Sequence, residues 1–531
     1  MYSDKAHVNY LTRILLNQGI TDIVVCPGAR NAPLCHNFHE AGFTLHPVTD
    51  ERSAAFVALG IYLETRRPTL VCVTSGSALL NTLPAVAEAF YRHIPLIVVS
   101  ADRPEKWIGQ LDGQTIPQKG ALQPYAKCIN IAEEDKLEGL PQKIAEELSM
   151  PRPLHINVEL EEPLFNFTEE ELPQVEKIEF TEINPLFEFS ENDLQTVANA
   201  INEAKFPLLM MGQIEEPIHT LANDLRCCMA IHPEILSNTS WYTQVSSQLE
   251  KCLAAGVQPP IIPDLIIHVG GPFICKQMKL FLRKQPGIRV IRIGLEEEPP
   301  KTFGRVDFAV RTHPVAFLNE LVPLLNYNYD SFTDWANLIE REYNKIEDQT
   351  NLLKEVWPLT QFNPPRLGAM HVANSSSVRM ANIVGPWGYS LTYCNRGVNG
   401  IEGSLSVAAG QSLKTDMTIG CIIGDLSFFY DSNALWNTRL GKNLIILLLN
   451  DGGGKIFHKL NKLKDSPALD EYIAAHHGAT AEGICASYNI NYVCKVSGQD
   501  DLSELNTIVN NHLESEATRP LVIEILLKPN N

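Results

Sequence analysis

The chain has 531 residues, of which 45% are hydrophobic and 20% charged, and its formal net charge is −19. This length and hydrophobic content are typical of a globular protein with about three domains. The negative charge argues against nucleic acid and anionic membrane surfaces as partners, because both carry the same sign of charge.

Two further features of the sequence concern the compartment. No apolar run approaches the length of a membrane span, and residues 1–19 predict an amphipathic helix with charges throughout rather than a signal peptide. The twelve cysteines include no CxxC pair, which predicts buried thiols and gives no support for structural zinc. We therefore expect a cytoplasmic protein without membrane insertion.

From the N-terminus to about residue 165, helical and strand patterns alternate as in βαβ units. Each predicted strand ends in polar, turn-forming residues, which places those residues along one edge of a parallel sheet. The predicted helices cover about 4–18, 53–64 and 79–91, and the predicted strands cover 23–26, 44–48, 70–73 and 96–100.

A segment rich in Glu, Pro and Thr, about 163–184, predicts a linker, and a charged helical connector is predicted at about 329–354. The fold class that follows is α/β, with three doubly wound parallel-sheet domains at 1–180, 185–345 and 358–531. The later predicted strands are 207–211, 265–269, 290–293, 419–423, 444–449 and 521–526, with a helical segment at about 427–440.

The stretch 424–457 holds the most informative residues of the third unit. One short apolar run ends in Gly424-Asp425, and the next ends in Asn450-Asp451 followed by three glycines. Because both runs predict buried parallel strands, the two aspartates should meet at one edge of a sheet. That edge is where open α/β sheets bind ligands.

Such an edge suits a divalent cation that holds a diphosphate. Mg²⁺ prefers hard oxygen ligands, usually one or two carboxylates together with phosphate oxygens. The predicted metal ligands are therefore Asp425, Asp451 and the carbonyl of Gly453, for Mg²⁺ or Mn²⁺. Glycines let the backbone approach phosphate closely. The alternative is a strand-end aspartate that caps a helix beside a glycine-rich turn.

The Gly424-Asp425 pair, with Asn450-Asp451 following 25 residues later, resembles the metal and diphosphate motif of thiamin diphosphate enzymes. The order of units is similar to that of the decarboxylase-like members. The resemblance implies a pyrimidine-binding domain at 1–180, a central domain, and a diphosphate-binding domain at 358–531. The cofactor-binding residues that it implies are Glu51, Thr74, Gly76, Asn81, Ile401, Gly424, Asp425, Leu426, Ser427, Asp451, Gly453, Gly454 and Ile456.

Glu51 stands where this family places the glutamate that holds N1′ of the aminopyrimidine. Forming the reactive carbanion requires the imino tautomer of the cofactor, and a carboxylic acid exchanging a proton with N1′ supplies it. Such a group works best when it is desolvated, and the apolar segment after it offers suitable walls. The alternative role for Glu51 is an acidic residue that stabilises a helix N-terminus.

Ile401 lies where the family has a large aliphatic side chain that wedges the cofactor into a bent shape. The alternative is an ordinary core isoleucine. The family's cofactor lies between the first unit of one subunit and the third unit of another. The resemblance therefore implies a homodimer at least, and a homotetramer as the larger assembly.

The segments PGARNAPL, TDERSA, SADRPE, CNRGVNGIEG and NDGGGKIF closely resemble one family in particular. These are the 2-succinyl-5-enolpyruvyl-6-hydroxy-3-cyclohexene-1-carboxylate synthases of menaquinone biosynthesis. The resemblance implies decarboxylation of 2-oxoglutarate, 1,4-addition of the succinyl carbanion to isochorismate, and release of CO₂. An FAD requirement is not expected, because the central unit shows no convincing dinucleotide fingerprint.

Both implied substrates are dianions, and local cations must overcome the negative charge of the chain. Arginine suits bidentate carboxylate contacts. By their motifs, the catalytic residues implied beside Glu51 are Arg30, Gln114 and Arg396. The implied substrate-binding residues are Arg30, Arg103, Gln114, Lys276, Ser375, Arg379, Arg396, Phe457 and Leu460, with Ile456 in the apolar wall. A single arginine is more often a solvated surface charge than a ligand, but Arg30, Arg103, Arg379 and Arg396 all fall at predicted sheet edges.

Four positions depart from the family pattern: Ala29, Gly113, Gln277 and Asp451. They remove polar or positive groups, or add a negative one, and the sequence leaves their effect open. Two alternative functions also stay open. One is another thiamin diphosphate-dependent 2-oxo acid lyase, such as an acetolactate synthase or a simple decarboxylase. The other is a non-catalytic binding subunit with the same fold.

Overall fold

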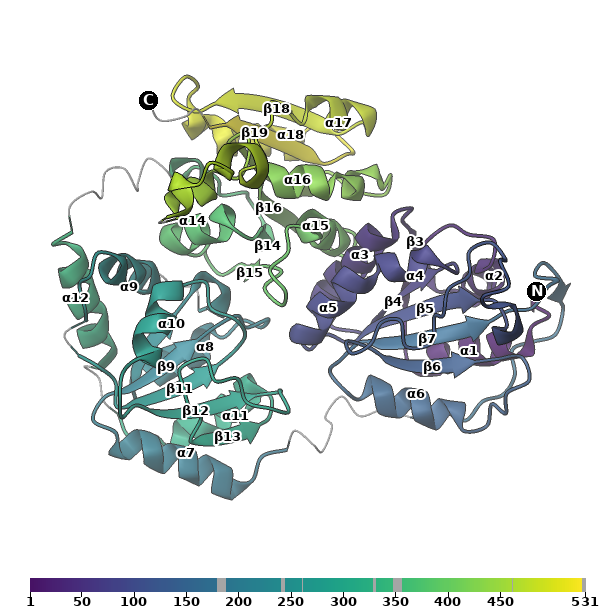
Figure 1. Cartoon of the computed structure of the whole chain (residues 1–531), viewed down its shortest axis with the longest axis horizontal. Coiled ribbons are helices and arrows are strands. Elements are labelled where there is room, and N and C mark those ends of the chain that lie inside the picture. The colour runs from purple at the N-terminus through teal and green to yellow at the C-terminus, as the bar shows by residue number, and fades with distance from the viewer. Residues whose placement is uncertain are drawn as a thin grey trace.

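The computed structural model describes residues 1–178, 188–239, 244–259, 261–327, 331–346, 356–460 and 462–527. In these residues, three sheets of parallel strands follow one another along the chain. Figure 1 shows them as three α/β bodies, coloured purple to blue, teal, and green to yellow. We refer to them as the first, central and third units.

The first unit has six parallel strands in the order β3-β2-β4-β5-β7-β6. Val71 and Val73 of β4 join one hydrophobic cluster, whereas Leu70 and Cys72 join another. Because successive side chains of a strand point to opposite faces, both faces of this sheet are covered. Its strands are β2 (Asp22–Val25), β3 (Thr44–Pro47), β4 (Thr69–Val73), β5 (Leu96–Asp102), β6 (Lys127–Ile131) and β7 (Leu154–Glu159), and its helices are α1 (Ala6–Asn17), α2 (Ala32–Glu40), α3 (Glu51–Thr65), α4 (Ser77–Asn81), α5 (Leu83–Tyr91) and α6 (Leu140–Leu148).

The central unit has five parallel strands in the order β10-β9-β11-β12-β13. A helix of the predicted connector, α12, places Trp335 and Ile339 in the core of this unit, so this part of the connector packs as part of it. Its strands are β9 (Pro207–Met211), β10 (Ala230–Pro233), β11 (Leu265–Val269), β12 (Arg289–Gly294) and β13 (Phe308–Arg311), and its helices are α7 (Glu191–Glu203), α8 (His219–Arg226), α9 (Gln244–Ala254), α10 (Lys276–Arg283), α11 (Pro314–Leu321) and α12 (Ser331–Tyr343).

The third unit repeats the strand order of the first. Its sheet has the order β15-β14-β16-β17-β19-β18, and when the strands of each unit are numbered along the chain, both sheets read 2-1-3-4-6-5. Its strands are β14 (Leu367–Val372), β15 (Leu391–Tyr393), β16 (Thr418–Gly424), β17 (Leu444–Asn450), β18 (Asn491–Val496) and β19 (Leu521–Leu526), and its helices are α14 (Ser376–Val384), α15 (Ser404–Ser412), α16 (Asp425–Tyr430), α17 (Glu482–Ser487) and α18 (Leu505–Glu514).

The predicted fold class is confirmed, since all three sheets are parallel and lie in α/β units. The strands of each sheet fall within one predicted domain range, and the boundary residues themselves stay predictions. Parts of the predicted linker and connector, 179–184 and 347–354, lie outside the described residues. The start of the predicted linker forms β8 (Phe167–Thr168), which pairs with β1 (Tyr2–Ser3) in an antiparallel manner.

Two predicted helices are wrong in extent. The segment predicted as one helix at about 427–440 forms α16 and then a 3₁₀ segment, η5 (Ser432–Trp436). The break falls at Asp431, whose buried carboxylate accepts hydrogen bonds from the N–H and hydroxyl of Ser406 at 2.8 and 2.7 Å. The helix predicted at 79–91 divides into α4 and α5 around Thr82, whose hydroxyl donates to the carbonyl of Leu79.

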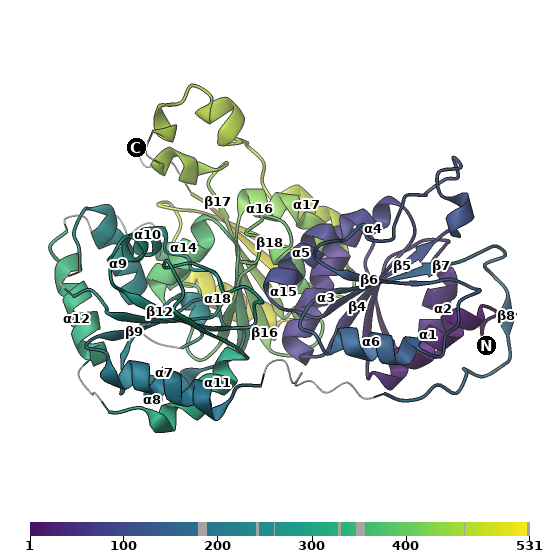
Figure 2. The ribbon, with the colours of Figure 1, turned by 60° about the horizontal axis from the view of Figure 1, so that its bottom comes forward.

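The first and third units meet where α3 crosses α15, as both views show (Figures 1 and 2). A Cβ on Gly60 would lie 2.0 Å from the carbonyl oxygen of Val407, and a Cβ on Gly410 would lie 2.1 Å from that of Val57. These distances are far below van der Waals contact, so glycine is required at both positions for the two backbones to approach this closely.

The central unit is joined to the third by hydrogen bonds between backbone and side chains. The side chain of Asn238 accepts from the N–H of Thr392 at 2.8 Å, and Gln213 donates to the carbonyl of Cys394 at 3.0 Å. Ile235 and Ile274 of the central unit also enter a hydrophobic cluster of the third. The loop that follows β15 is therefore held in place by the central unit.

Among the described residues, no helix is both long and apolar enough to cross a membrane.

Substitution of Gly410 by alanine tests the contact between α3 and α15. We expect Gly410→Ala to lower the thermal unfolding midpoint by roughly 2–12 °C, because overpacking a tight contact costs roughly 1–3 kcal/mol and each kcal/mol shifts the midpoint of a 150–250-residue unit by about 2–4 °C. The matched control is Gly483→Ala in α17, where an added Cβ meets nothing within 4 Å. Equal midpoints for the two variants in scanning calorimetry would contradict the close approach of the helices.

Candidate active site

Asp425 lies where β16 ends and α16 begins, and it is 4% exposed. Its Oδ2 accepts hydrogen bonds from the N–H groups of Gly452 and Gly453 at 2.8 and 2.9 Å, and its Oδ1 accepts from Leu426 N–H at 2.7 Å. The carboxylate therefore joins the ends of two neighbouring strands, β16 and β17. This confirms that the two halves of the stretch 424–457 meet at one sheet edge.

Asp451 contributes a second carboxylate at this edge. Its Oδ1 is buried and has no hydrogen-bond partner in the part of the chain that the structure describes. Burial, and then the negative charge of Asp425, raise the pKa of the Asp451 carboxyl to about 6. A buried carboxylate oxygen beside another carboxylate is costly unless a cation neutralises the pair. The donor set therefore fits a hard divalent cation.

The turn after β17 is shaped for close backbone approach. Gly452 and Gly453 have φ of 77° and 140°, and a Cβ on Gly453 would lie 2.7 Å from the carbonyl of Ala474. The side chain of Asn450 anchors the start of the turn. It donates to the carboxylate of Glu524 at 2.7 Å and to the carbonyl of Ala479 at 2.9 Å. Glycine at position 453 is therefore required by both conformation and space.

The other predicted cofactor residues of this unit lie around that turn. Gly454 donates its N–H to the carbonyl of Ala474 at 2.6 Å, and Ser427 is buried in the first turn of α16. Ile456 and Phe457 are half-buried on the 3₁₀ segment η6 (Lys455–Lys459), and Leu460, just after it, is 47% exposed.

In the first unit, Asp50 and Glu51 have separate roles. Asp50 caps α3, since its carboxylate accepts from the N–H groups of Arg52 and Ser53. Glu51 instead accepts a hydrogen bond from the side chain of Asn81 at 3.2 Å. The capping function that could have explained an acidic residue here is thus performed by its neighbour. Glu51 is half-buried in the first turn of α3, so stabilisation of the helix N-terminus stays an alternative to the predicted cofactor contact.

Thr74 and Gly76 follow β4 at the same sheet edge as Glu51. The Oγ1 of Thr74 is buried without a hydrogen-bond partner within the described segments. Gly76 has a φ of 84° and donates its N–H to Gln118 at 2.7 Å. A Cβ on Gly76 would lie 3.1 Å from the backbone of Gln114, so the two predicted residues are close together.

Ile401 is 41% exposed in the single chain. It lies in the loop between β15 and α15, which Asn374 holds by donating to the carbonyls of Asn395 and Gly400 at 2.7 and 2.8 Å. The alternative of an ordinary core isoleucine is wrong for the single chain, because half of a large apolar side chain remains uncovered.

Arg30 and Arg103 lie close together at the edge of the first sheet. Arg30 donates to the carbonyl of Leu160 and to the carboxylate of Glu162, both at 2.9 Å. The guanidinium of Arg103 lies 3.6 Å from the same carboxylate oxygen. Gln114 is exposed nearby, on the loop whose Gly113 carbonyl accepts from Arg103. Two arginines thus converge on one exposed carboxylate.

The remaining cations gather between the central and third units. Arg396 donates to Asn374 at 3.2 Å and to the carbonyl of Phe273 at 3.1 Å. Arg379 donates to the carbonyl of Ser375 at 2.6 Å. Desolvation, and then the charge of Arg396, lower the pKa of Arg379. The fixed left-handed φ of Ser375, 72°, turns the chain into α14.

Lys276 is exposed at the first position of α10. The N–H groups of Lys276, Gln277 and Met278 all donate to the carboxylate of Glu250. A second lysine, Lys279, donates to the carbonyl of Phe273 at 3.3 Å, the same oxygen that Arg396 contacts. Sequence reasoning missed Lys279, although its spacing of three residues from Lys276 on a helix was a usable signal.

Glu88 is the other residue that the sequence did not reveal. It is fully buried on α5, and its two carboxylate oxygens accept from the N–H groups of Gly397 and Val398 at 2.9 and 2.8 Å. Burial raises the pKa of this carboxyl, and the nearby Arg92 opposes the shift. Glu88 therefore positions the loop that carries Arg396, although it belongs to the first unit.

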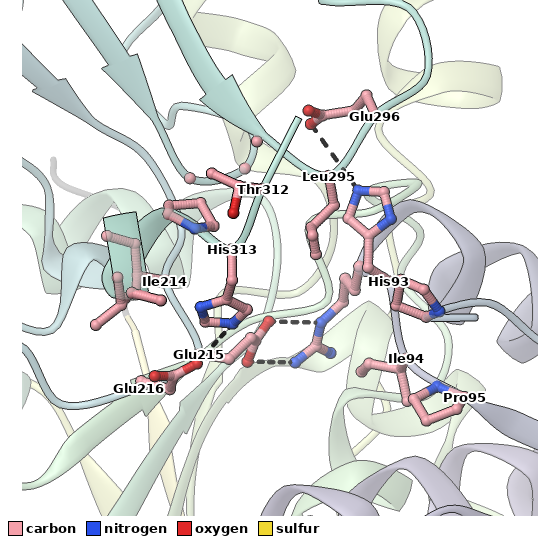
Figure 3. A pocket seen from close by; sticks show the side chains of 18 of the residues that line it. His93, Ile94, Pro95, Ile214, Glu215, Glu216, Leu295, Glu296, Thr312 and His313 are labelled. Atoms are coloured by element: carbon pink, nitrogen blue, oxygen red, sulfur yellow. Dashed lines mark hydrogen bonds and ion pairs between the residues drawn. The ribbon is translucent and has the colours of Figure 1, made fainter. Parts of the chain in front are cut away.

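Arg92 extends this contact to the central unit. It forms a bidentate pair with Glu215 at 2.9 Å and donates to Asn395 at 3.2 Å. Glu215 borders a cavity of about 840 Å³ between the first and central units. Figure 3 shows His93 facing Glu296 and His313 facing Glu216 in the same cavity, so three of its carboxylates, including that of Glu215, have an arginine or histidine partner.

The four departures from the family pattern lie at different places. Ala29 and Gly113 are exposed near the arginine pair of the first unit, Gln277 lies on α10, and Asp451 stands at the candidate metal site. Their effect stays open.

Replacement of Glu88 tests its hold on the loop that carries Arg396. In Glu88→Gln one oxygen is replaced by an NH₂ group, which cannot accept from a backbone N–H. We expect amide hydrogen exchange in the segment 394–400 to accelerate at least tenfold, with exchange in β18 unchanged. The control is Glu138→Gln, an exposed position of the same unit. Unchanged protection of the loop in mass-spectrometric exchange would refute the positioning role.

Comparison with known proteins agrees with this geometry. The family model described as the N-terminal TPP binding domain of thiamine pyrophosphate enzymes matches residues 7–126. A solved structure, benzoylformate decarboxylase from Polynucleobacter necessarius, superposes with a TM-score of 0.73 at 15% identity, covering 100% of both chains. At that identity the likeness shows the fold alone.

Two relatives are similar over their whole length. The 2-succinyl-5-enolpyruvyl-6-hydroxy-3-cyclohexene-1-carboxylate synthase of Bacteroides thetaiotaomicron is 35% identical over 562 residues, covering 100% of this chain and 97% of the relative. The synthase of the same name from Desulfotalea psychrophila is 32% identical over 550 residues, covering 99% of each chain. By this similarity the chain belongs to the 2-succinyl-5-enolpyruvyl-6-hydroxy-3-cyclohexene-1-carboxylate synthase family of thiamin diphosphate enzymes.

Proposed function

We propose that the chain is a 2-succinyl-5-enolpyruvyl-6-hydroxy-3-cyclohexene-1-carboxylate synthase of menaquinone biosynthesis. In this reaction 2-oxoglutarate loses its C1 carboxyl as CO₂, and the remaining four-carbon unit adds to isochorismate in a 1,4-addition. The observation that carries the proposal is the grouping of cations at two sheet edges, beside a pair of carboxylates suited to a metal–diphosphate.

Thiamin diphosphate, when bound, supplies a thiazolium carbon that stabilises the carbanion left by decarboxylation. Asp425, Asp451 and the carbonyl of Gly453 would hold Mg²⁺ or Mn²⁺ against its diphosphate. Glu51 would exchange a proton with N1′ of the aminopyrimidine. Asn81, another of the predicted cofactor residues, donates to the Glu51 carboxylate at 3.2 Å and would orient it for that exchange.

The cations fit the charge of the substrates. Both are dianions, and the chain carries a net charge of −19, so binding depends on local positive groups. Arg30 and Arg103 share one exposed carboxylate oxygen, that of Glu162, which supports a role for this pair in binding a substrate carboxylate. Arg379, Arg396 and Lys276 would serve the second dianion, with Phe457 and Leu460 against its ring.

The single chain presents only part of this site. The first-unit arginines are bound by first-unit groups, and the third-unit arginines by groups of the third and central units. Large side chains remain exposed where a second chain would pack: Leu80 (43%), Ile401 (41%), Tyr430 (52%) and Trp436 (51%). We propose a homodimer that joins the first unit of one chain to the third unit of the other, and a homotetramer as the larger assembly.

We propose that the enzyme acts in the cytoplasm. The twelve cysteines are all free, as expected for a protein in a reducing compartment.

The deciding experiment measures 2-oxoglutarate consumption with thiamin diphosphate and Mg²⁺, in the presence and absence of isochorismate. We expect consumption to require isochorismate for full rate, with one CO₂ released per product. An acetolactate synthase or simple decarboxylase would need fewer cations for a monocarboxylate substrate. Turnover of pyruvate without turnover of 2-oxoglutarate would overturn the assignment in favour of that class.

Glu51→Gln separates cofactor binding from catalysis. We expect the variant to bind thiamin diphosphate with Mg²⁺ about as well as the unaltered chain, while turnover falls about 10²- to 10⁴-fold, because glutamine cannot exchange a proton with N1′. Calorimetry measures the binding and a CO₂ assay measures the turnover. Glu138→Gln is the matched control. A Glu51→Gln variant with unchanged turnover would contradict the role given to this carboxyl.

A further inference from the structure

A cluster of metal-ligating side chains lies on the segment that follows the glycine-rich turn. The Nε2 of His458 lies 2.9 Å from Oδ1 of Asp470, and the Nε2 of His476 lies 3.3 Å from the same oxygen. These three ligand atoms all lie within 4.8 Å of one another. His458 belongs to η6 and Asp470 to the π-helical turn η8 (Leu469–Ile473), and all three side chains are exposed.

The hydrogen bonding of His476 points to a bound cation. Its Nδ1 faces the carbonyl oxygen of Gly452 at 3.4 Å, and its Nε2 faces the carboxylate of Asp470. Both neighbours are acceptors only, and a neutral imidazole has a single N–H. One of these two contacts therefore lacks a hydrogen unless the ring takes up a second proton or its Nε2 binds a metal ion. A metal ion on Nε2, with Nδ1–H donating to a backbone carbonyl, satisfies both contacts and is the usual arrangement of a metal-bound histidine.

The spacing of the ligand atoms also suits a transition metal. Zinc binds histidine nitrogen and carboxylate oxygen at roughly 2.0–2.2 Å in tetrahedral geometry, which separates neighbouring ligand atoms by roughly 3.3 Å. The separations of 2.9 and 3.3 Å from Asp470 lie within a few tenths of an ångström of that spacing, and the ligand nitrogens of His458 and His476 lie within 4.8 Å of each other. Two imidazoles and a carboxylate favour Zn²⁺ and similar ions over Mg²⁺, which prefers oxygen.

We propose that His458, Asp470 and His476 form a binding site for a divalent transition-metal ion such as Zn²⁺, separate from the carboxylate pair of Asp425 and Asp451. Water completes the coordination, because the cluster is open to solvent. The ion joins η6 to η8 and, through His476, supports the carbonyl of Gly452. It therefore stabilises the segment 455–477, which bears the predicted apolar wall of the active site. The site itself does not depend on the proposed function.

Zinc titration of the whole chain tests this site. The protein is first saturated with thiamin diphosphate and Mg²⁺ and carries Cys494→Ser, since Cys494 is the exposed thiol. We expect one Zn²⁺ per chain by calorimetry, with the affinity falling at least tenfold in His458→Gln and in His476→Gln. His39→Gln, an exposed histidine on α2, is the matched control and should bind as the parent does.

A second measurement protects the test against misfolded variants. Zn²⁺ should slow amide exchange in 455–477 in the parent and leave it unchanged in Asp470→Asn, with the thermal midpoints of both proteins equal in the absence of Zn²⁺. Equal Zn²⁺ affinity in the parent and in both histidine variants would overturn the proposal. So would the absence of saturable Zn²⁺ binding to the parent, which would mean that a second proton on His476 satisfies the two acceptors.

Discussion

The contact between α3 and α15 is the constraint on which the rest of the molecule depends. Three glycines permit it: Gly60 and Gly410 bring the helix backbones together, and Gly403, at the start of α15, lies where a Cβ would be 2.4 Å from the ring of Phe56. The same contact fixes where α3 begins, and so where Glu51 lies, and where the loop with Ile401 ends. A core cluster that spans both units forms around it, so the position of two candidate cofactor residues follows from one packing event.

At the candidate metal site, backbone N–H groups stabilise the negative charge of one of the two aspartates more than that of the other. Asp425 uses one oxygen to accept two N–H groups of the glycine-rich turn, which stabilises its negative charge, while the buried Oδ1 of Asp451 has no such partner among the described residues. Two carboxylates with different surroundings therefore share one edge. Asp425 organises the turn through its hydrogen bonds alone. Burial of the ionised Asp451 carboxylate becomes favourable when a cation binds beside it.

Local sequence patterns predicted much of this arrangement and failed at identifiable places. Apolar runs located β11 and β19 at their full extent, because buried parallel strands are continuous and end in turn residues. The extents of α16 and α5 were wrong, since Asp431 and Thr82 end helices through side-chain contacts that periodicity does not encode. Glu88 could not be found from sequence, because its partners Gly397 and Val398 lie in another unit more than three hundred residues away. The residues Asp425 and Arg396 were visible because they belong to motifs.

The shared strand order of the first and third sheets has an evolutionary consequence. In both sheets an arginine follows the first strand, Arg30 just before α2 and Arg379 within α14, and the third strand is followed by a buried residue, Thr74 in one and Asp425 in the other. Two copies of one ancestral fold, paired through a single helix in each, would give this arrangement. The close contact between α3 and α15 would then correspond to the interface between the two ancestral copies.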